Sequence, residues 1–346
     1  MSINISRREF LKLSATTLVG LMLPRNLLSR LDADPATRRN PQLLGRVLKD
    51  QAPLYTVPSE GSAILNELVK DQIHRITDVT TGKDDTSGNR VWYQLDGAGY
   101  THSRHIQPVR MEVNTPALTI PEKGCLGEIT LPYVDAYSSL GTKRKWLYRF
   151  YYASTFWVTG VKSDENGVAW YELLDDRNYT KFYIPAISMR LVPDDELTAL
   201  YPHIPYQDKQ LVIDLAKQTL TALIGERVIT TMRISSGIRQ GEGGFATPKG
   251  AFRTVRKRPC RHMVALPSEF GTGFDLPGVP WVSYFTVDGV ALHGTYWHND
   301  FGIPHSHGCI NLHPQNAKWI YLWTTPTVPP DEYYFADDQG TRVIIQ

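Results

Sequence analysis

Short runs that alternate hydrophobic and polar residues dominate the chain after residue 50. Gln210–Leu215 alternates in this way, and residues 219–223 and 227–230 follow it after short turns. A period of two residues, interrupted by turns rich in Gly and Pro, predicts strands joined as hairpins. A helix is expected to start near His313-Pro314. The fold class is therefore predicted to be mainly β.

Two segments between residues 50 and 200 resemble each other. Val91-Trp92-Tyr93-Gln94-Leu95 matches Ala169-Trp170-Tyr171-Glu172-Leu173, and an aromatic residue and a threonine follow each of them. The Trp-Tyr strand followed by Gly-Tyr resembles bacterial SH3-like domains, which are small antiparallel barrels often found beside cell-wall enzymes. This resemblance implies two SH3-like modules, residues 50–112 and 113–200. Whether they would bind the wall or only space an enzyme stays open.

The first 49 residues are expected to be an export signal and a linker. Arg7 and Arg8 stand in Ser6–Lys12, directly before the apolar residues 13–23. This apolar run is shorter than the roughly 20 residues of a membrane span, so it favours a signal peptide. The segment resembles a twin-arginine signal, which implies export of the folded protein across the bacterial plasma membrane. The leader is then either cleaved or kept as a membrane anchor; residues 26–49 are expected to be linker.

Charge and cysteine content exclude several classes of protein. The net charge of +2 arises in the leader, so the remaining chain is close to neutral and no nucleic-acid partner is expected. Three cysteines in 346 residues do not make a disulfide scaffold. Cys125 and Cys260 are expected to be buried thiols or a pair, and His102 and His105 to be solvated.

The residues that can carry chemistry lie between positions 293 and 311. His293 follows the apolar strand 284–292, and Cys309 follows Ser306-His307-Gly308. A cysteine nucleophile attacks as thiolate, and a histidine on a nearby strand can take its proton. Gly308 permits a sharp turn whose N–H groups, its own and that of Cys309, would face a developing oxyanion. Cys309 is expected to hold the most thiolate of the three cysteines at neutral pH.

His293-Gly294 and Ser306-His307-Gly308-Cys309-Ile310-Asn311-Leu312 resemble the signature of the L,D-transpeptidase (YkuD-type) catalytic domain. Further upstream, Ser235-Ser236-Gly237 and Thr247-Pro248-Lys249-Gly250 also agree with it. The resemblance covers roughly residues 207–346, and the catalytic domain is predicted over 205–346. Many members carry Arg where this chain has Asn311, which excludes a guanidinium role there.

The resemblance implies a role for each of these residues. Cys309 would form a thioester with a peptidoglycan tetrapeptide stem, and His293 would act as its base, held in one tautomer by the Gly294 carbonyl. His307 and Gly308 would contribute to the oxyanion site, with Ser306 and Asn311 bracing the turn. The acceptor would be the amine of a second stem, giving a 3→3 cross-link. Carbapenem-type inhibitors are expected to acylate Cys309, and no metal or organic cofactor is expected.

Three alternatives stay open. The same Cys/His pair could serve a cell-wall cysteine peptidase, an amidase or an L,D-carboxypeptidase, in which water replaces the amine. The chain could be a non-catalytic wall-binding protein. A zinc site is the third alternative, although these residues lack a usual ligand spacing: His298, His305, His307 and Cys309, with Cys260 and His262 upstream.

Overall fold

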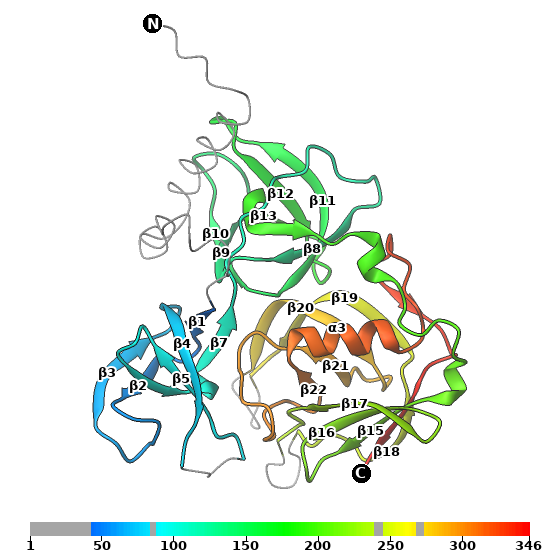
Figure 1. The fold of residues 1–346 in the computed structure, drawn as a ribbon. Coiled ribbons are helices and arrows are strands. Elements are labelled where there is room, and N and C mark those ends of the chain that lie inside the picture. Colours follow the sequence, from blue (N-terminus) through cyan, green and yellow to red (C-terminus); the bar gives the residue numbers. More distant parts are fainter. Residues whose placement is uncertain (1–42, 84–87, 239–244, 268–272) are drawn as a thin grey trace, which may run out of the picture.

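The computed structural model describes residues 43–83, 88–238, 245–267 and 273–346, in which strands predominate (Figure 1). Strands account for 47% of the structure, which confirms the prediction of a mainly β chain. The predicted leader with Arg7 and Arg8 lies outside the described residues. In the described ranges, no helix is both long and apolar enough to cross a bilayer.

The first module is a seven-stranded sheet in the order β3-β2-β6-β5-β4-β1-β7. All the hydrogen-bonded neighbours in this sheet run antiparallel. Its strands are β1 (Leu44–Val47), β2 (Gln51–Tyr55), β3 (Ile64–Val69), β4 (Ile73–Thr81), β5 (Val91–Leu95), β6 (Gly99–His102) and β7 (Ile106–Val109).

Strand β1 lies in the segment predicted to be linker, so the prediction for residues 26–49 is wrong at this point. The strand pairs with β4 on one side and β7 on the other, and both Leu44 and Val47 are buried. A strand with neighbours on both sides can be stable at four residues, because every backbone group on it finds a partner. Such a short segment shows too few alternations to be recognised as a strand.

The second module repeats the topology of the first, with the strand order β10-β9-β13-β12-β11-β8-β14. The two Trp-Tyr segments form the equivalent strands β5 and β12, with Trp92 and Trp170 buried in their cores, which confirms the internal repeat. No closed barrel is found among the described strands, so the SH3-like assignment stays a prediction. The strands are β8 (Cys125–Ile129), β9 (Tyr133–Tyr137), β10 (Trp146–Tyr151), β11 (Thr155–Ser163), β12 (Ala169–Leu174), β13 (Lys181–Pro185) and β14 (Met189–Leu191).

The C-terminal region contains two five-stranded sheets, β17-β16-β15-β24-β18 and β22-β21-β20-β19-β23, and one helix. A shared core cluster joins residues of both sheets with the helix, including Leu211, Trp281 and Ile320. The elements are β15 (Lys209–Asp214), β16 (Thr219–Ile224), β17 (Arg227–Arg233), β18 (Gly250–Arg253), β19 (Arg256–Ala265), β20 (Phe274–Tyr284), β21 (Ala291–Gly294), β22 (Ile310–Leu312), α3 (Pro314–Trp323), β23 (Phe335–Ala336) and β24 (Arg342–Ile345).

Helix α3 begins at Pro314, next to His313, as the sequence predicts. Proline suits a first helical position because its missing N–H has no intrahelical partner there. At the other end, buried Lys257 donates to the carbonyls of Tyr321 and Thr324, which are at the negative end of the helix dipole. The helix packs against β20 and β21, so it supports the strand that carries His293.

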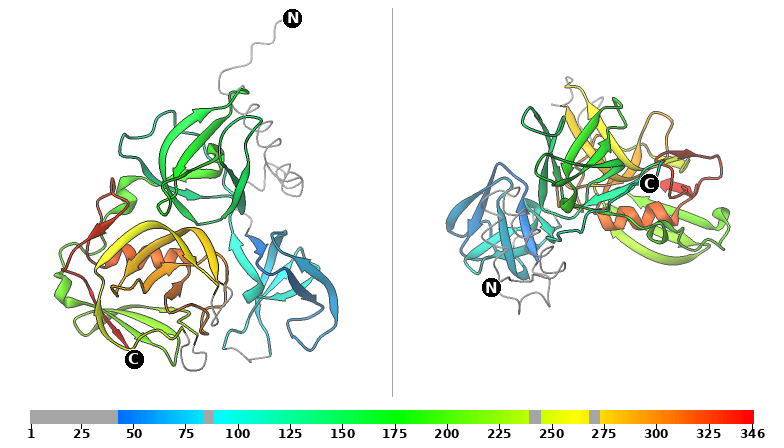
Figure 2. Two further views of the ribbon diagram at one scale, coloured as in Figure 1. Left: turned by 180° about the vertical axis from the view of Figure 1, so that it is seen from behind. Right: turned by 90° about the horizontal axis from the view of Figure 1, so that it is seen from above.

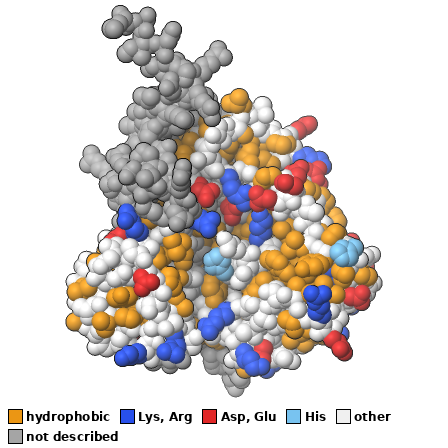
Figure 3. Space-filling model, viewed as in Figure 1, with side chains coloured by type: hydrophobic (Ala, Val, Ile, Leu, Met, Phe, Trp, Pro, Cys, Tyr) orange, Lys and Arg blue, Asp and Glu red, His pale blue; other side chains and the backbone are white. Residues whose placement is uncertain are grey.

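Lysine and arginine side chains are spread over the face drawn in Figure 3, where hydrophobic and acidic side chains separate them. The same surface view therefore shows no basic stripe of the kind that follows a nucleic-acid backbone.

The three parts of the chain lie against one another (Figure 2). The buried guanidinium of Arg46 on β1 contacts each of them. It donates to Asp71 and Gln107 of the first module and to the carbonyl of Tyr296 in the C-terminal region. It also lies 3.9 Å above the centre of the Tyr151 ring of the second module. A single side chain thus contacts all three parts of the chain.

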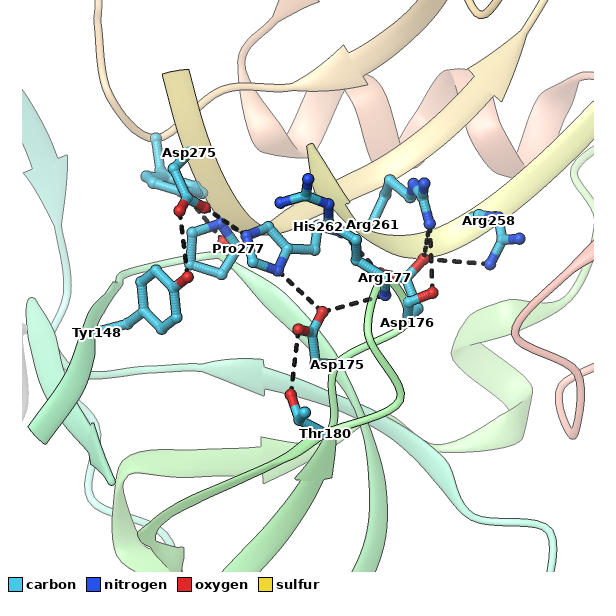
Figure 4. Close-up of polar contacts among 11 residues, drawn as sticks. Tyr148, Asp175, Asp176, Arg177, Thr180, Arg258, Arg261, His262, Asp275 and Pro277 are labelled. Atoms are coloured by element: carbon cyan, nitrogen blue, oxygen red, sulfur yellow. Dashed lines mark hydrogen bonds and ion pairs between the residues drawn. The ribbon is translucent and has the colours of Figure 1, made fainter. Parts of the chain in front are cut away.

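A second contact joins the second module to the C-terminal region through His262 on β19 (Figure 4). Its Nδ1 lies 2.9 Å from Asp175 and its Nε2 lies 2.5 Å from Asp275. Burial alone would lower the pKa of His262, but the two carboxylates outweigh it and raise the pKa. The charged and titratable groups around this ring are Asp175, Asp176, Arg258, Arg261, Asp275 and Tyr148.

We expect His262→Gln to destabilise the protein more at pH 6 than at pH 9. A histidine whose pKa is raised by folding contributes its full stabilisation below its ordinary pKa of about 6.5 and loses it as pH rises through the higher folded value. At pH 6 the variant leaves buried Asp175 without its charged partner, at a cost of about 3–5 kcal/mol. Thermal unfolding at the two pH values measures the difference. The control is His203→Gln at an exposed site; an equal loss for His262→Gln at pH 6 and 9 would contradict this assignment.

Candidate functional site

The predicted base and nucleophile lie on neighbouring segments. Strands β21 and β22 pair in parallel, with His293 opposite Asn311 and Leu292 opposite Ile310. Side chains alternate along a strand, so residue 309 belongs to the same side of this pair as residues 311 and 293. The Trp297 side chain supports this placement, because its ring lies 5.8 Å from that of His293 and it packs in the apolar cluster that includes Cys309.

The His293 imidazole is buried and held by its own neighbour. Its Nδ1 lies 3.0 Å from the carbonyl oxygen of Gly294, the contact expected from the sequence. Burial lowers the pKa of His293 to about 4, so the ring is neutral at physiological pH. With its hydrogen on Nδ1 and donated to Gly294, the ring leaves Nε2 unprotonated. This nitrogen can accept a proton.

Cys309 is also in its neutral form. Burial raises the pKa of its thiol to about 11. Burial also raises the pKa of Cys125 to about 11 and that of Cys260 further. No cation near the sulfur of Cys309 offsets the loss of water, so its pKa does not separate it from Cys125. That Cys309 holds the most thiolate at neutral pH stays a prediction. Its thiol lies 4.0 Å from the Gly289 carbonyl and makes no hydrogen bond to His293 in this structure. At neutral pH the thiol of Cys309 is therefore largely protonated.

A network of short hydrogen bonds fixes the turn before Cys309. Ser306 Oγ donates to the carbonyl of Cys309 at 2.5 Å and accepts from the N–H of Gly308 at 3.1 Å. Gly308 has φ of 105°, a conformation that side chains strongly disfavour. The N–H of Gly308 is therefore engaged with Ser306, which corrects the expectation that it faces an oxyanion. The N–H of Cys309 remains as the proposed donor.

The upstream motifs lie directly against this turn. Gly237 forms a bridge to Ser306, and its N–H donates to Thr247 Oγ1 at 2.8 Å. The same Thr247 hydroxyl donates to the carbonyl of Gly308 at 2.8 Å. A Cβ atom on Gly237 would lie 2.8 Å from Gly308 Cα and would overlap the carbonyl oxygen of Phe245. The Ser-Ser-Gly and Thr-Pro-Lys-Gly segments thus shape the nucleophile turn.

The His307 ring lies outside this network. It is exposed, and its centre lies 4.3 Å from the ring of Phe245 and 5.1 Å from the ring of Phe274. Sequence reasoning missed both phenylalanines, which carry no pattern that separates them from ordinary core residues. The aromatic packing fixes the turn from its solvent side.

Asn311 faces a second buried histidine. The Asn311 amide lies 2.8 Å from His298 Nε2, while His298 Nδ1 accepts from the N–H of Asp300. Burial lowers the pKa of His298 well below its usual value, so this ring carries one hydrogen, which must be on Nε2. That hydrogen needs an acceptor, so the Asn311 amide is better oriented with Oδ1 toward His298. Asn311 therefore braces the site through His298.

The residues weighed for a zinc site do not converge on one point. His298 and His305 stack in parallel with ring centres 4.3 Å apart, whereas His262 on β19 binds the carboxylates of Asp175 and Asp275. In the part of the chain that the structure describes, no group of three or more His, Cys, Asp or Glu side chains could hold a metal ion.

Cys125 and Cys260 are free thiols, the first of the two alternatives expected for them; Cys260 is buried and Cys125 is partly buried. The expectation for His102 and His105 needs correction. His102 is buried with Nε2 at 2.7 Å from the Asn89 carbonyl, and His105 is largely buried. His102 caps the 3-10 turn Ser103–His105, where its Nδ1 accepts from the N–H of Arg104, and His105 is the last residue of that turn. Both side chains therefore pack within the module and do not face solvent as expected.

Residues 208–345 match the YkuD family model, the L,D-transpeptidase catalytic domain. A protein of Bacillus subtilis (strain 168), provisionally named as the L,D-transpeptidase YciB, is 29% identical over 131 residues. The match covers 35% of this chain and 63% of that relative, which is less than two thirds of its length. Both findings show that the C-terminal region is similar to the L,D-transpeptidase catalytic domain.

Solved structures give weaker similarity. An L,D-transpeptidase from Xylanimonas cellulosilytica is 27% identical with a TM-score of 0.30, covering 40% of this chain and 61% of that one. An L,D-transpeptidase from Mycobacterium smegmatis is 23% identical with a TM-score of 0.32, covering 49% and 75%. The assignment of residues 208–345 depends on the family match rather than on these superpositions.

Gly237→Ala is expected to slow alkylation of Cys309 at least tenfold and to lower the thermal midpoint, because the new methyl group displaces the Gly308 turn. Gly160→Ala is the matched control, since a Cβ atom added at Gly160 would lie 3.8 Å from its nearest neighbour outside the adjoining residues. Peptide mapping after limited iodoacetamide treatment measures the rate at Cys309. An unchanged rate in Gly237→Ala would show that the turn does not need this close approach.

Alkylation of Cys309 should rise about tenfold per pH unit between pH 7 and pH 10, because the thiolate fraction of a group with a pKa of about 11 grows in that proportion. The labelling rate of the full chain is measured by mass spectrometry of the peptide that contains Cys309. A plateau below pH 8 would mean that a neighbouring cation stabilises the thiolate, against the neutral thiol described above.

Proposed function

We propose that the chain is a cysteine-dependent peptidoglycan L,D-transpeptidase that forms 3→3 cross-links. The observation that supports this most directly is the register of β21 and β22, which brings a neutral imidazole and a cysteine to one side of an L,D-transpeptidase catalytic domain. Cys309 is the proposed nucleophile and His293 the proposed base. The donor is a tetrapeptide stem and the acceptor is the side-chain amine of a second stem.

In the first half-reaction, Sγ of Cys309 attacks the carbonyl carbon of the third stem residue while Nε2 of His293 takes the thiol proton. The negative charge moves to the carbonyl oxygen, where the N–H of Cys309 stabilises it. The bond to the terminal D-Ala nitrogen then breaks, and His293 returns the proton to that leaving amine. The products are free D-Ala and a thioester on Cys309.

In the second half-reaction, the acceptor amine attacks the thioester carbon and gives one proton to His293. The carbon–sulfur bond breaks, the new amide forms, and the proton passes from His293 back to the sulfur. Water in place of the amine would give an L,D-carboxypeptidase by the same path. Both routes need a base that is neutral before each step, which the low pKa of His293 provides.

The remaining parts fit a protein of the cell wall. The leader with Arg7 and Arg8 would export the folded chain to the periplasm or wall, where stem peptides are found, and would either be cleaved or remain as an anchor. The two modules, proposed to be SH3-like, would stand between this leader and the catalytic domain. The proposed steps use only protein side chains and backbone amides.

The decisive experiment incubates the full chain with a defined tetrapeptide stem, with and without an acceptor stem, and identifies products by mass. We expect D-Ala release and a cross-linked product that Cys309→Ala abolishes. His293→Ala should lose about 10²–10⁴-fold, the usual contribution of a general base, and His307→Ala should lose less. A carbapenem should add one drug mass to the peptide that contains Cys309.

Cys125→Ala and Cys260→Ala are the controls, and both should keep the adduct. Release of D-Ala without cross-linking would indicate a carboxypeptidase, and no turnover with no adduct would indicate a non-catalytic wall-binding protein. An adduct that survives in Cys309→Ala would identify another nucleophile.

A further inference from the structure

A cleft opens where the two modules and the catalytic domain meet. We call it the junction cleft and define it by Lys70 and Asp71 of the first module, Trp146 and Tyr148 of the second, and Leu276 and Trp297 of the catalytic domain. Its volume is about 490 Å³, within the range of about 300–1,000 Å³ typical of ligand sites. No single part of the chain encloses this space, so the cleft exists only in the assembled protein.

Aromatic surface is the main feature of the junction cleft. The Trp146 side chain is 59% exposed, yet its indole N–H donates to Asp135 at 3.2 Å, which fixes the ring. The Tyr148 hydroxyl donates to Asp275, whose other oxygen contacts His262 (Figure 4). Trp146 thus joins Tyr148, Tyr151 and Trp297 in an aromatic lining with one ring held in place and open to a ligand.

The charges around the cleft are already paired. Arg149 contacts both Asp135 and Asp71, and Arg46 contacts Asp71. Lys70 lies 3.9 Å from Asp50. Each cation in the described lining therefore has a carboxylate partner, which leaves no strong site for the carboxylates of a free peptide.

The cleft adjoins the catalytic residues. Trp297 lines the cleft, and its ring lies 5.8 Å from that of His293. Leu276 also lines the cleft, and it packs on the same apolar cluster as Cys309. A ligand bound there lies next to the wall of the catalytic site.

We propose that the junction cleft binds the sugar rings of the peptidoglycan glycan strand, and so positions the attached stem for Cys309. This inference rests on the proposed transpeptidase function, because it assigns a second part of the same substrate. A pyranose ring has C–H groups on its faces and hydroxyl groups around its rim. The C–H groups suit the negative face of an indole, and the rim suits a fixed carboxylate such as that of Asp275.

The binding test uses the full chain with Cys309→Ala, so that no acyl-enzyme forms. Peptide-free glycan oligomers prepared from peptidoglycan are titrated by calorimetry and by tryptophan fluorescence. We expect saturable binding that Trp146→Ala weakens at least tenfold and Trp146→Phe largely restores. Tyr334→Ala, at a 42% exposed aromatic residue outside the cleft, is the matched control and should bind as the parent does.

Titration with the sugar-free tetrapeptide stem separates the possible occupants. We expect Trp146→Ala to leave the affinity for this stem unchanged. If the variant loses stem binding and keeps glycan binding, or if the parent binds no glycan, the proposal is overturned. Thermal midpoints show whether each variant is folded.

The binding test is independent of the proposed chemistry, since it is made without the nucleophile. Glycan binding together with absent transfer in the active chain would refute the transpeptidase assignment and leave the cleft in place. Transfer to free stems without glycan binding would support the transpeptidase assignment and refute the proposal for the junction cleft.

Discussion

The arrangement of the whole chain depends on the burial of Arg46. An arginine that is 2% exposed must have its charge and its donors satisfied, because an unpaired buried guanidinium would cost several kcal/mol. Asp71 supplies the counter-charge, Gln107 a side-chain oxygen, and Tyr296 a backbone carbonyl. Burial lowers the pKa of Arg46, and Asp71 counters this effect. These partners come from distant parts of the sequence, so satisfying one side chain fixes their relative positions.

This constraint extends to the proposed catalytic residues. Tyr296 follows His293-Gly294-Thr295, and its ring packs on Tyr151 at 5.6 Å and on Trp297 at 5.0 Å. The segment after the proposed base is therefore fixed from the side of the two modules. From the other side, Gly237, Thr247 and Ser306 fix the nucleophile turn by hydrogen bonds. The two proposed catalytic residues lie between these two sets of contacts, which explains how a short parallel pair of strands can hold them in register.

Sequence patterns predicted the elements that are determined by neighbouring residues in the chain. Alternating apolar residues located the strands of the C-terminal region, and the Trp-Tyr segments located equivalent strands of the two modules. His313-Pro314 located the start of the helix because proline has a clear positional preference. The apolar strand expected over 284–292 is instead the end of β20, a turn and the start of β21, so only the last part of that prediction is confirmed. Whether the modules are SH3-like and where the domain boundaries fall stay predictions.

Features that depend on tertiary contacts could not be predicted from the sequence. Arg46 stood in a segment that looked like a linker, because its partners are 25 to 250 residues away. His262 was weighed as a metal ligand, whereas its partners Asp175 and Asp275 come from two different strand regions. The pKa of a thiol depends on burial and on neighbouring charge, and neither is visible in the order of residues. Trp297 carried no motif at all.

The neutral states of Cys309 and His293 bear on how the proposed reaction would proceed. Burial raises the thiol pKa to about 11 and lowers the imidazole pKa to about 4, so both groups are neutral before substrate arrives. The charge must therefore develop together with the bond to the carbonyl carbon, in a site that excludes water and offers a backbone N–H to the oxyanion. Such a site gains from binding energy far from the reacting atoms, because that energy can hold the stem against Cys309 while the proton moves. A glycan bound in the junction cleft would supply such remote binding energy, and the enzyme would then favour stems attached to the wall over free peptides. On this proposal, the contacts of Arg46 and His262 keep the junction cleft at a fixed distance from Cys309.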